Sequence, residues 1–231
     1  GLERMACIMQ GVDTIFDVDT IKHIRMAVEK MTGATYGVNP KVDKSVRIIT
    51  DHIRSVSFLV ADGVLPSNEG RGYVVRRVLR RAVRFGKKIG INESFMYKLV
   101  PTVGEIMQDF YPEVTEKAEF IQRVIKNEED RFHETLDGGL AILSEVIEAQ
   151  KAKGETVIPG ADAFKLYDTF GFPIDLTREI AEENGFTTDM DGFNALMQEQ
   201  KQRARSARAN ISGWSDKSKS FDIAKTNFVG Y

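Results

Sequence analysis

The chain has 231 residues, a formal net charge of −2, 42% hydrophobic residues and 29% charged residues. That balance is typical of a soluble globular protein with one large or two small domains, and it excludes a protein that is basic throughout. The single cysteine, Cys7, excludes an internal disulfide, and no apolar run approaches the roughly 20 residues of a membrane span. We see no signal peptide and expect a cytoplasmic protein without membrane contact.

Apolar residues recur every three or four positions along most of the chain, which predicts an all-α, multi-helix fold. The expected helices, in chain order, cover residues 2–10, 17–31, 43–62, 73–89, 92–109, 115–151, 161–167, 176–184 and 189–209. The seventh of these segments is short and fits an extended conformation as well. We expect short β segments only near Asp168 and at the C-terminus.

Glycine, proline and aspartate residues set the expected breaks and helix starts. Pro101 breaks the fifth helix, and the pair Gly138-Gly139 marks a bend in the sixth. Asp175 is expected to cap the eighth. Residues 211–227 are polar and rich in serine and lysine, which is typical of a linker.

The most distinctive feature is a local concentration of positive charge. Between Arg71 and Lys88 the chain has six arginines, two lysines and no acidic residue. On a helix turning about 100° per residue, seven of these side chains share an arc of roughly 140°, opposite an apolar face. We call these seven residues the cationic stripe: Arg76, Arg77, Arg80, Arg81, Arg84, Lys87 and Lys88.

A stripe of this density repels itself unless anions lie across it, and a phosphate backbone is one candidate. Acidic side chains of the same chain, such as Glu128, Glu129 and Asp130, are another. An anionic membrane surface and plain solvation remain open as well. The preceding loop contains Ser67 and Asn68, either of which could cap the basic helix or reach a base edge.

The sequence contains no recognisable catalytic or metal-binding set. Its three histidines, His23, His52 and His133, lie far apart, whereas a zinc site needs about four ligands at characteristic spacing. There is no GxxxxGK[ST] loop and no GxGxxG after a strand. Trp214 is the single tryptophan, so an aromatic stacking platform is not expected.

Three blocks of sequence resemble the alanyl-tRNA synthetase family. The run SVRIITDHIRSVSFLVADGVLPSNEGRGYVVRRVLRRAVRFGKKIG resembles the segment that follows the catalytic core of that family. The run AFKLYDTFGFPIDLTREIAEENG resembles a later segment, and GLERMACIMQGV at the start resembles the end of class II motif 3, with its GxGLER pattern. The blocks occur in the family's order and cover most of the chain.

The resemblance implies a fragment with three parts. Residues 1–13 would end the catalytic core, residues 14–210 would form a helical tRNA-recognition domain, and residues 211–231 would be a linker and the first strand of an editing domain. The first and last residues, GLERMACIMQ and FVGY, themselves suggest that both ends continue into a longer protein.

In this family the segment recognises the acceptor stem of tRNA(Ala), whose identity signal is a G·U wobble at the third base pair. By motif match the resemblance implies that Asn68 and Asp168 read this pair. An amide can donate and accept a hydrogen bond and a carboxylate only accepts, which suits the base edges that a wobble pair leaves exposed. The stripe, together with Arg71, would hold phosphates and fix the register of the RNA.

Arg4 lies in the GLER block, and the resemblance implies that it contacts the phosphates of ATP. ATP, Mg²⁺ and alanine would be used by the full-length enzyme and zinc by its downstream domain, so we expect no metal and no catalytic residue here. The chain alone is therefore expected to be inactive.

Two other functions are compatible with the pattern. The chain could be a helical interaction or dimerisation module whose stripe meets an acidic protein. It could also be a helix-turn-helix DNA-binding domain within residues 43–88, although the connection at residues 63–72 is long for the turn of three or four residues in that motif.

Overall fold

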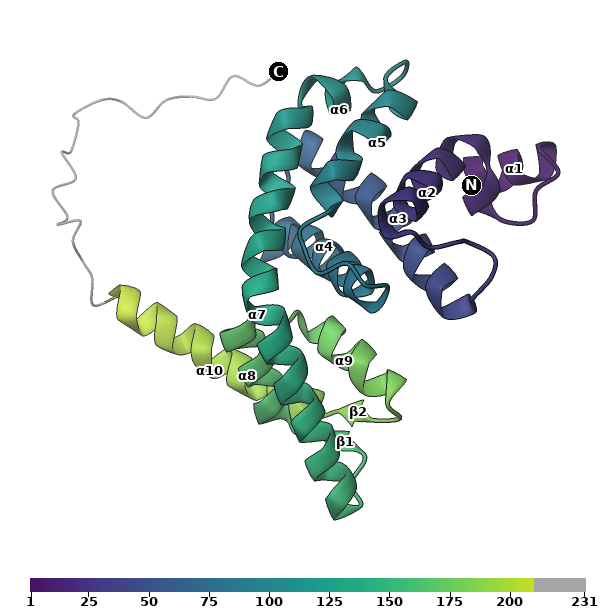
Figure 1. Ribbon diagram of the computed structural model, residues 1–231. Coiled ribbons are helices and arrows are strands. Elements are labelled where there is room, and N and C mark those ends of the chain that lie inside the picture. The colour runs from purple at the N-terminus through teal and green to yellow at the C-terminus, as the bar shows by residue number, and fades with distance from the viewer. Residues whose placement is uncertain (210–231) are drawn as a thin grey trace, which may run out of the picture.

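The computed structural model describes residues 1–209 and confirms an all-α fold (Figure 1). The first part of the chain forms α1 (Leu2–Met9), η1 (Ile15–Asp17), α2 (Asp19–Thr32), α3 (Pro40–Ala61), α4 (Gly70–Lys88), η2 (Met96–Leu99), α5 (Val100–Met107) and α6 (Pro112–Glu116). The second part forms α7 (Ala118–Lys153), β1 (Val157–Ile158), α8 (Gly160–Phe170), α9 (Ile174–Glu183), β2 (Thr187–Thr188) and α10 (Met190–Ala209). The expected linker and last strand lie outside the described residues.

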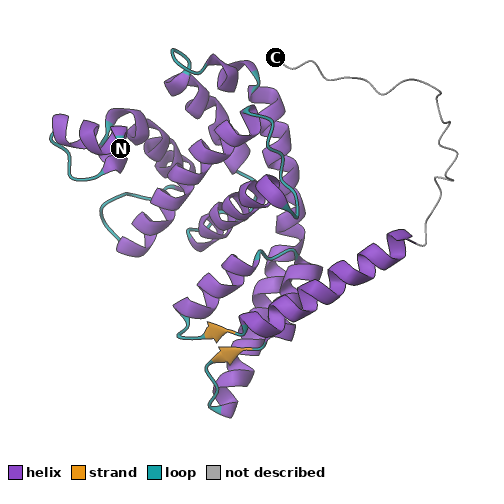
Figure 2. Cartoon of the chain, turned by 180° about the vertical axis from the view of Figure 1, so that it is seen from behind, coloured by secondary structure: helices purple, strands orange, loops and turns teal. Residues whose placement is uncertain are grey.

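The 36-residue helix α7 joins two groups of elements. Helices α3 to α6 lie beside its first half, with α2 and α1 beyond them, whereas α8, α9, α10 and the two strands lie around its second half (Figure 1). The strands pair in parallel, Val157 opposite Thr187 and Ile158 opposite Thr188 (Figure 2). Short β segments were expected near Asp168, and the structure has two of them, before and after the helices α8 and α9, while Asp168 itself is helical. Their exact positions were not predicted, because two-residue strands leave no periodic pattern in the sequence.

The buried face of α3 confirms the periodicity that predicted this helix. Its apolar positions at three- and four-residue spacing are fully buried: Val46, Ile49, Ile53, Val56 and Val60. They pack into one core with residues of α4, α5 and α7. The basic helix α4 is therefore held on its apolar side by α3, as the amphipathic pattern predicted.

Several expected helix boundaries were wrong by a few residues. Helix α3 begins at Pro40, because the Asn39 side chain accepts a hydrogen bond from the backbone of Lys41 and the proline needs no donor partner there. The expected break near Pro101 is confirmed, because the 3-10 helix η2 ends at Leu99 and Pro101 lies in the first turn of α5. Asp175 does not cap α9, which begins at Ile174 after Pro173.

The pair Gly138-Gly139 lies inside α7 without interrupting it, and a close contact explains its composition. A Cβ atom on Gly139 would lie 2.3 Å from the Cε2 atom of Phe172, whose side chain is fully buried. A Cβ atom on Gly138 would meet its nearest neighbour, the Cε1 atom of Phe170, at 3.2 Å. Gly139 therefore lets the segment between α8 and α9 pack against α7.

Buried Glu129 ties α7 to the start of η2. Its carboxylate accepts hydrogen bonds from the backbone N–H groups of Phe95, Met96 and Tyr97 at 3.0, 2.9 and 3.1 Å. Burial raises the pKa of Glu129 to about 7, although these three donors favour the ionised form.

The two glycines of α7 give a matched test of packing. We expect Gly139→Ala to lower the free energy of unfolding by about 1–3 kcal/mol, because the added methyl group overlaps Phe172. Gly138→Ala is the control, because the partly exposed Phe170 ring need shift by only a few tenths of an ångström and the alanine gains up to about 1 kcal/mol of helix propensity. Urea denaturation of both variants measures the difference, and equal stability would contradict the close contact.

Candidate nucleic-acid interface

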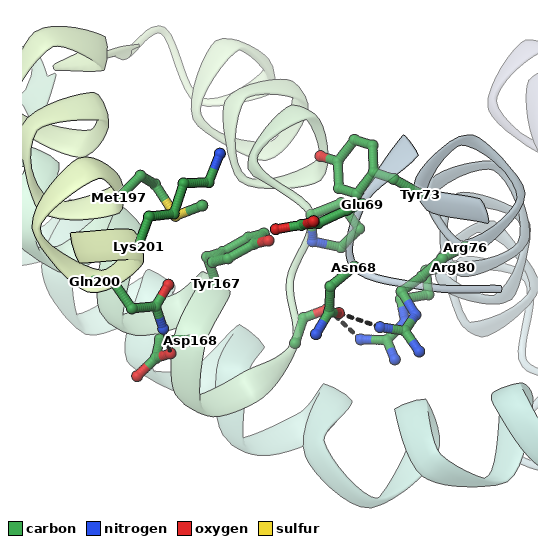
Figure 3. Close-up of a pocket in the computed structure, with 12 residues that line it drawn as sticks. Asn68, Glu69, Tyr73, Arg76, Arg80, Tyr167, Asp168, Met197, Gln200 and Lys201 are labelled. Atoms are coloured by element: carbon green, nitrogen blue, oxygen red, sulfur yellow. Dashed lines mark hydrogen bonds between the residues drawn. The ribbon is translucent and has the colours of Figure 1, made fainter. Parts of the chain in front are cut away.

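A cleft of about 360 Å³ lies between the loop before α4, the end of α8 and the middle of α10 (Figure 3). Asn68 and Asp168, a hundred residues apart in the sequence, both line it. The other lining residues are Glu69, Tyr73, Arg76, Arg80, Tyr167, Gly171, Pro173, Met197, Gln200 and Lys201. The structure therefore brings together the two residues that the sequence singled out as base readers.

Asn68 is not a helix cap. The cap position of α4 is taken by Glu69, whose side chain makes no capping bond, and the Oδ1 atom of Asn68 accepts a hydrogen bond from Arg76. Ser67 is also not a cap, because its hydroxyl donates to the backbone oxygen of Glu69. The amide of Asn68 is thus available on the surface of the cleft.

Gly72 allows the loop that carries Asn68 to fold back on α4. A Cβ atom there would lie 2.2 Å from the backbone oxygen of Leu65 and 2.3 Å from the Oγ atom of Ser67. The backbone N–H of Ser67 donates to the Gly72 oxygen at 3.1 Å. The loop is therefore held against the first turn of α4 by contacts that a larger residue would break.

Asp168 lies in the last turn of α8 and is exposed. The helix ends at Gly171, whose φ of 65° is the left-handed conformation usual after a helix. Asp168 therefore does not cap a turn before Gly171; its Oδ1 atom accepts a hydrogen bond from Gln200 of α10. In Figure 3, Asn68 lies beside Arg76, Asp168 lies beside Gln200, and Tyr167 is seen between them.

Two tyrosines supply hydroxyl groups to the cleft. Burial, reinforced by the charge of Asp175, raises the pKa of Tyr73 to about 12. Burial also raises the pKa of Tyr167 above its ordinary value. Both phenols consequently stay protonated at neutral pH and can donate a hydrogen bond.

The cationic stripe is paired with carboxylates of the chain itself. Arg76 and Arg80 bind Glu128 of α7, and Lys87 binds Asp137 of the same helix. The remaining pairs, all with α9, are Arg77–Asp175, Arg81–Glu179, Arg84–Glu179, Arg84–Glu183 and Lys88–Glu183. The expectation of acidic partners near Glu128 is confirmed, whereas the carboxylates of α9 were not expected.

The pair between Arg80 and Glu128 is the most buried of these contacts. Their side chains are 8% and 5% exposed, and the Nε atom of Arg80 donates to the Oε1 atom of Glu128 at 2.7 Å. The guanidinium also lies 4.8 Å from the ring centroid of Phe132 and donates to the backbone oxygen of Gly171. Burial lowers the pKa of Arg80, but the pairing with Glu128 opposes that shift.

The pairs with α9 form a ladder between two helices. Asp175, Glu179 and Glu183 follow one another at four-residue spacing and so lie along one face of α9. Burial works against ionisation of Glu183, but hydrogen bonds from Lys88 and Arg84 outweigh it and lower its pKa. The ladder holds the second group of elements against α4.

Two positive side chains near the cleft differ from the stripe. Arg71 is exposed in the first turn of α4, and no carboxylate among residues 1–209 lies within ion-pairing distance of it. Lys201 of α10 lines the cleft and is exposed. No sequence pattern places α10 here, because its contact with α8 is tertiary, and Gln200 and Lys201 were therefore not predicted as site residues.

Arg4 is exposed on α1, a helix without a buried residue. Its neighbour Glu3 pairs with Arg54 of α3, and a backbone hydrogen bond together with the hydrogen bond from Arg54 lowers the pKa of Glu3. A lone exposed arginine does not make a nucleotide site. Within residues 1–209 no cluster of three or more His, Cys, Asp or Glu side chains is arranged to hold a metal ion, and no helix of that region has the length and apolarity to cross a bilayer.

Comparison with known proteins identifies the family. The family model of tRNA synthetases class II (A) matches residues 1–231. The chain belongs to this family. It is 57% identical over 235 residues to the Alanine--tRNA ligase of Clostridioides difficile (strain 630), covering 100% of this chain and 27% of that protein.

Other relatives of this family give the same coverage. The Alanine--tRNA ligase of Bacillus subtilis (strain 168) is 54% identical over 233 residues, covering 100% of this chain and 26% of that protein. The one from Geobacillus thermodenitrificans (strain NG80-2) is 55% identical over 233 residues, with the same two shares. The resemblance to alanyl-tRNA synthetase is confirmed, and the chain spans about a quarter of the length of these curated relatives.

The stripe contains a buried and an exposed arginine whose replacement should differ strongly in effect. We expect Arg80→Met to lower the free energy of unfolding by about 3–5 kcal/mol, because it leaves Glu128 buried with one partner fewer. Arg77→Met breaks a pair whose two side chains are each 41% exposed and should cost less than about 1 kcal/mol. Urea denaturation compares them, and similar losses would contradict this difference in burial.

Proposed function

We propose that this chain is the part of an alanine–tRNA ligase that binds the acceptor stem of tRNA(Ala) and recognises its G·U wobble pair. The full-length enzyme would join alanine to this tRNA with ATP and Mg²⁺, and its zinc site would belong to another part of the protein. The observation that carries the proposal is the cleft that Asn68 and Asp168 line together.

The chemistry of the cleft suits a base pair rather than a phosphate. Asn68 offers an amide and Asp168 a carboxylate, so a donor and an acceptor face the same space. The hydroxyl groups of Tyr73 and Tyr167 add two more polar positions at its wall. A wobble pair exposes a guanine amine that lacks a pairing partner and displaces the neighbouring carbonyl groups, and such edges are read by donors and acceptors.

Phosphate contacts are proposed for the exposed cations only. Arg71 and Lys201 are exposed, and Arg77, Arg81, Lys87 and Lys88 keep between 27% and 41% of their side-chain surface exposed. Arg80 and Arg84, at 8% and 4%, hold carboxylates of the chain instead. Arg76, at 18%, binds Glu128 and Asn68, so the expected set of phosphate contacts is reduced by these three residues.

The alternative functions receive less support. A helix-turn-helix domain would have to insert α4 into a groove, but the stripe of α4 faces α7 and α9. A module that captures an acidic protein would draw on the same partly exposed cations, but it would give no role to the amide and carboxylate that Asn68 and Asp168 bring to the cleft.

Two acceptor-stem hairpins, one with G·U and one with G·C at the third pair, test the proposed function by titration. We expect the chain to bind the G·U hairpin more tightly, and Asn68→Ala to reduce the preference by about 1–3 kcal/mol, taking the scale of a good base contact. Arg71→Ala should weaken both hairpins alike and reduce the salt dependence of binding.

The outcomes separate the candidates. Equal affinity for both hairpins would contradict base reading and leave a phosphate-binding role. Absence of binding to either hairpin would favour a protein partner.

The chain is also expected to lack the activity of the full-length enzyme. Arg4 is the sole residue that the resemblance assigns to ATP, and it lies on an exposed helix. Alanine-dependent exchange of pyrophosphate into ATP should therefore stay at background with this chain. Exchange well above a buffer control would contradict the expectation.

A further inference from the structure

We propose that Arg76 and Gln200 are positioning residues that orient the two readers of the cleft, Asn68 and Asp168. This inference rests on the proposed function and assigns to Arg76 a role other than a phosphate contact. Each of the two residues donates a hydrogen bond to one reader and is itself held by a different part of the fold.

Arg76 is fixed by α7. Its Nε atom lies 3.0 Å from the Oε1 atom of Glu128, and its Nη2 atom donates to Oε2 at 3.2 Å. The Glu128 side chain is 5% exposed and also binds Arg80, so the carboxylate cannot turn away. This single hydrogen bond and the ion pair hold the guanidinium against one buried carboxylate, which restricts its orientation.

The orientation of the Arg76 guanidinium determines which groups of the Asn68 amide are available to a base. The Nη1 atom of Arg76 donates to the Oδ1 atom of Asn68, so the acceptor side of the amide is occupied. A guanidinium can only donate, which excludes the flipped amide with its nitrogen against Arg76. The two N–H groups of Asn68 are consequently the part of its amide that remains for a base.

The packing of α10 on α8 places Gln200 beside Asp168. Phe193 of α10 is 4% exposed and packs edge-on against Tyr167, with ring centroids 5.7 Å apart. Helix α10 starts with the Oδ1 atom of Asp189 accepting from the backbone of Gly192 at 2.9 Å. Gln200 lies on the turns that follow and donates its amide N–H to Asp168.

This contact engages one carboxylate oxygen of Asp168. Its Oδ1 atom accepts from Gln200, whereas Oδ2 has no hydrogen-bond donor among the described residues and is the less engaged acceptor for a base. Asp168 is exposed and would otherwise rotate among several rotamers. A reader that is already oriented loses less conformational entropy on binding, which favours the pair it fits.

The test uses Arg76→Met and Gln200→Met in the 231-residue chain, with the G·U and G·C hairpins. Each variant should reduce the ratio of the two affinities by about three- to ten-fold, the range of one hydrogen bond. The controls are Arg123→Met, which removes a positive charge on the exposed side of α7, and Gln198→Met, which removes an exposed glutamine of α10. Both controls should keep the ratio.

Double variants distinguish positioning from direct contact. In the Asn68→Ala background, Arg76→Met should not change the affinity for either hairpin further. In the Asp168→Ala background, Gln200→Met should likewise leave both affinities unchanged. A further loss shared by both hairpins would mean that Arg76 binds phosphate, and it would overturn the inference for that residue.

A measurement on the free chain separates a change in the orientation of Asn68 from a general loss of folding. In the free chain, the NMR signals of the Asn68 side-chain amide should shift in Arg76→Met and stay in place in Arg123→Met. Unshifted signals, or an unchanged affinity ratio in both single variants, would overturn the inference while leaving the proposed function intact. Equal binding of the two hairpins by the unaltered chain would overturn both.

Discussion

The carboxylate of Glu128 is the point on which the arrangement of this chain depends. It lies on the long helix α7, is almost completely buried, and binds both Arg76 and Arg80 of α4. Burying an ionised carboxylate is unfavourable unless partners compensate for its lost hydration, so α4 can face α7 only in the register that supplies both arginines. The same register places the loop with Asn68 opposite the end of α8.

The positive charge of α4 therefore has a structural use before any ligand is considered. Seven cations on one face would repel one another, but the structure supplies carboxylates from α7 and α9, most of them about 50 or 100 residues away in the sequence. A cationic helix is thus weak evidence for a free nucleic-acid surface. In this chain the residues suited to reading bases lie at the end of the stripe, where the loop before α4 meets α8 and α10 (Figure 3).

The sequence predicted local features better than tertiary ones. The period of three to four residues identified α3 and its buried valines and isoleucines, because that pattern is local. The carboxylates opposite the stripe could not be assigned, since nothing in the order of residues says which face of α9 meets α4. Asn68 and Asp168 came from motif resemblance, and the structure added that they share a cleft. No sequence pattern pointed to Gln200, because its contact with Asp168 depends on how α10 packs against α8.

Ionic strength should act on this chain through two separate routes. In the proposed complex salt would screen the attraction between phosphates and exposed cations such as Arg71, and it also weakens partly exposed pairs such as Arg77–Asp175. The second effect loosens α9 and with it the segment that follows α8, whereas the buried pair of Arg80 and Glu128 is screened much less. The slope of RNA affinity against salt concentration would therefore overestimate the number of phosphate contacts. Part of that slope would come from weakening of the ion pairs between α4 and α9.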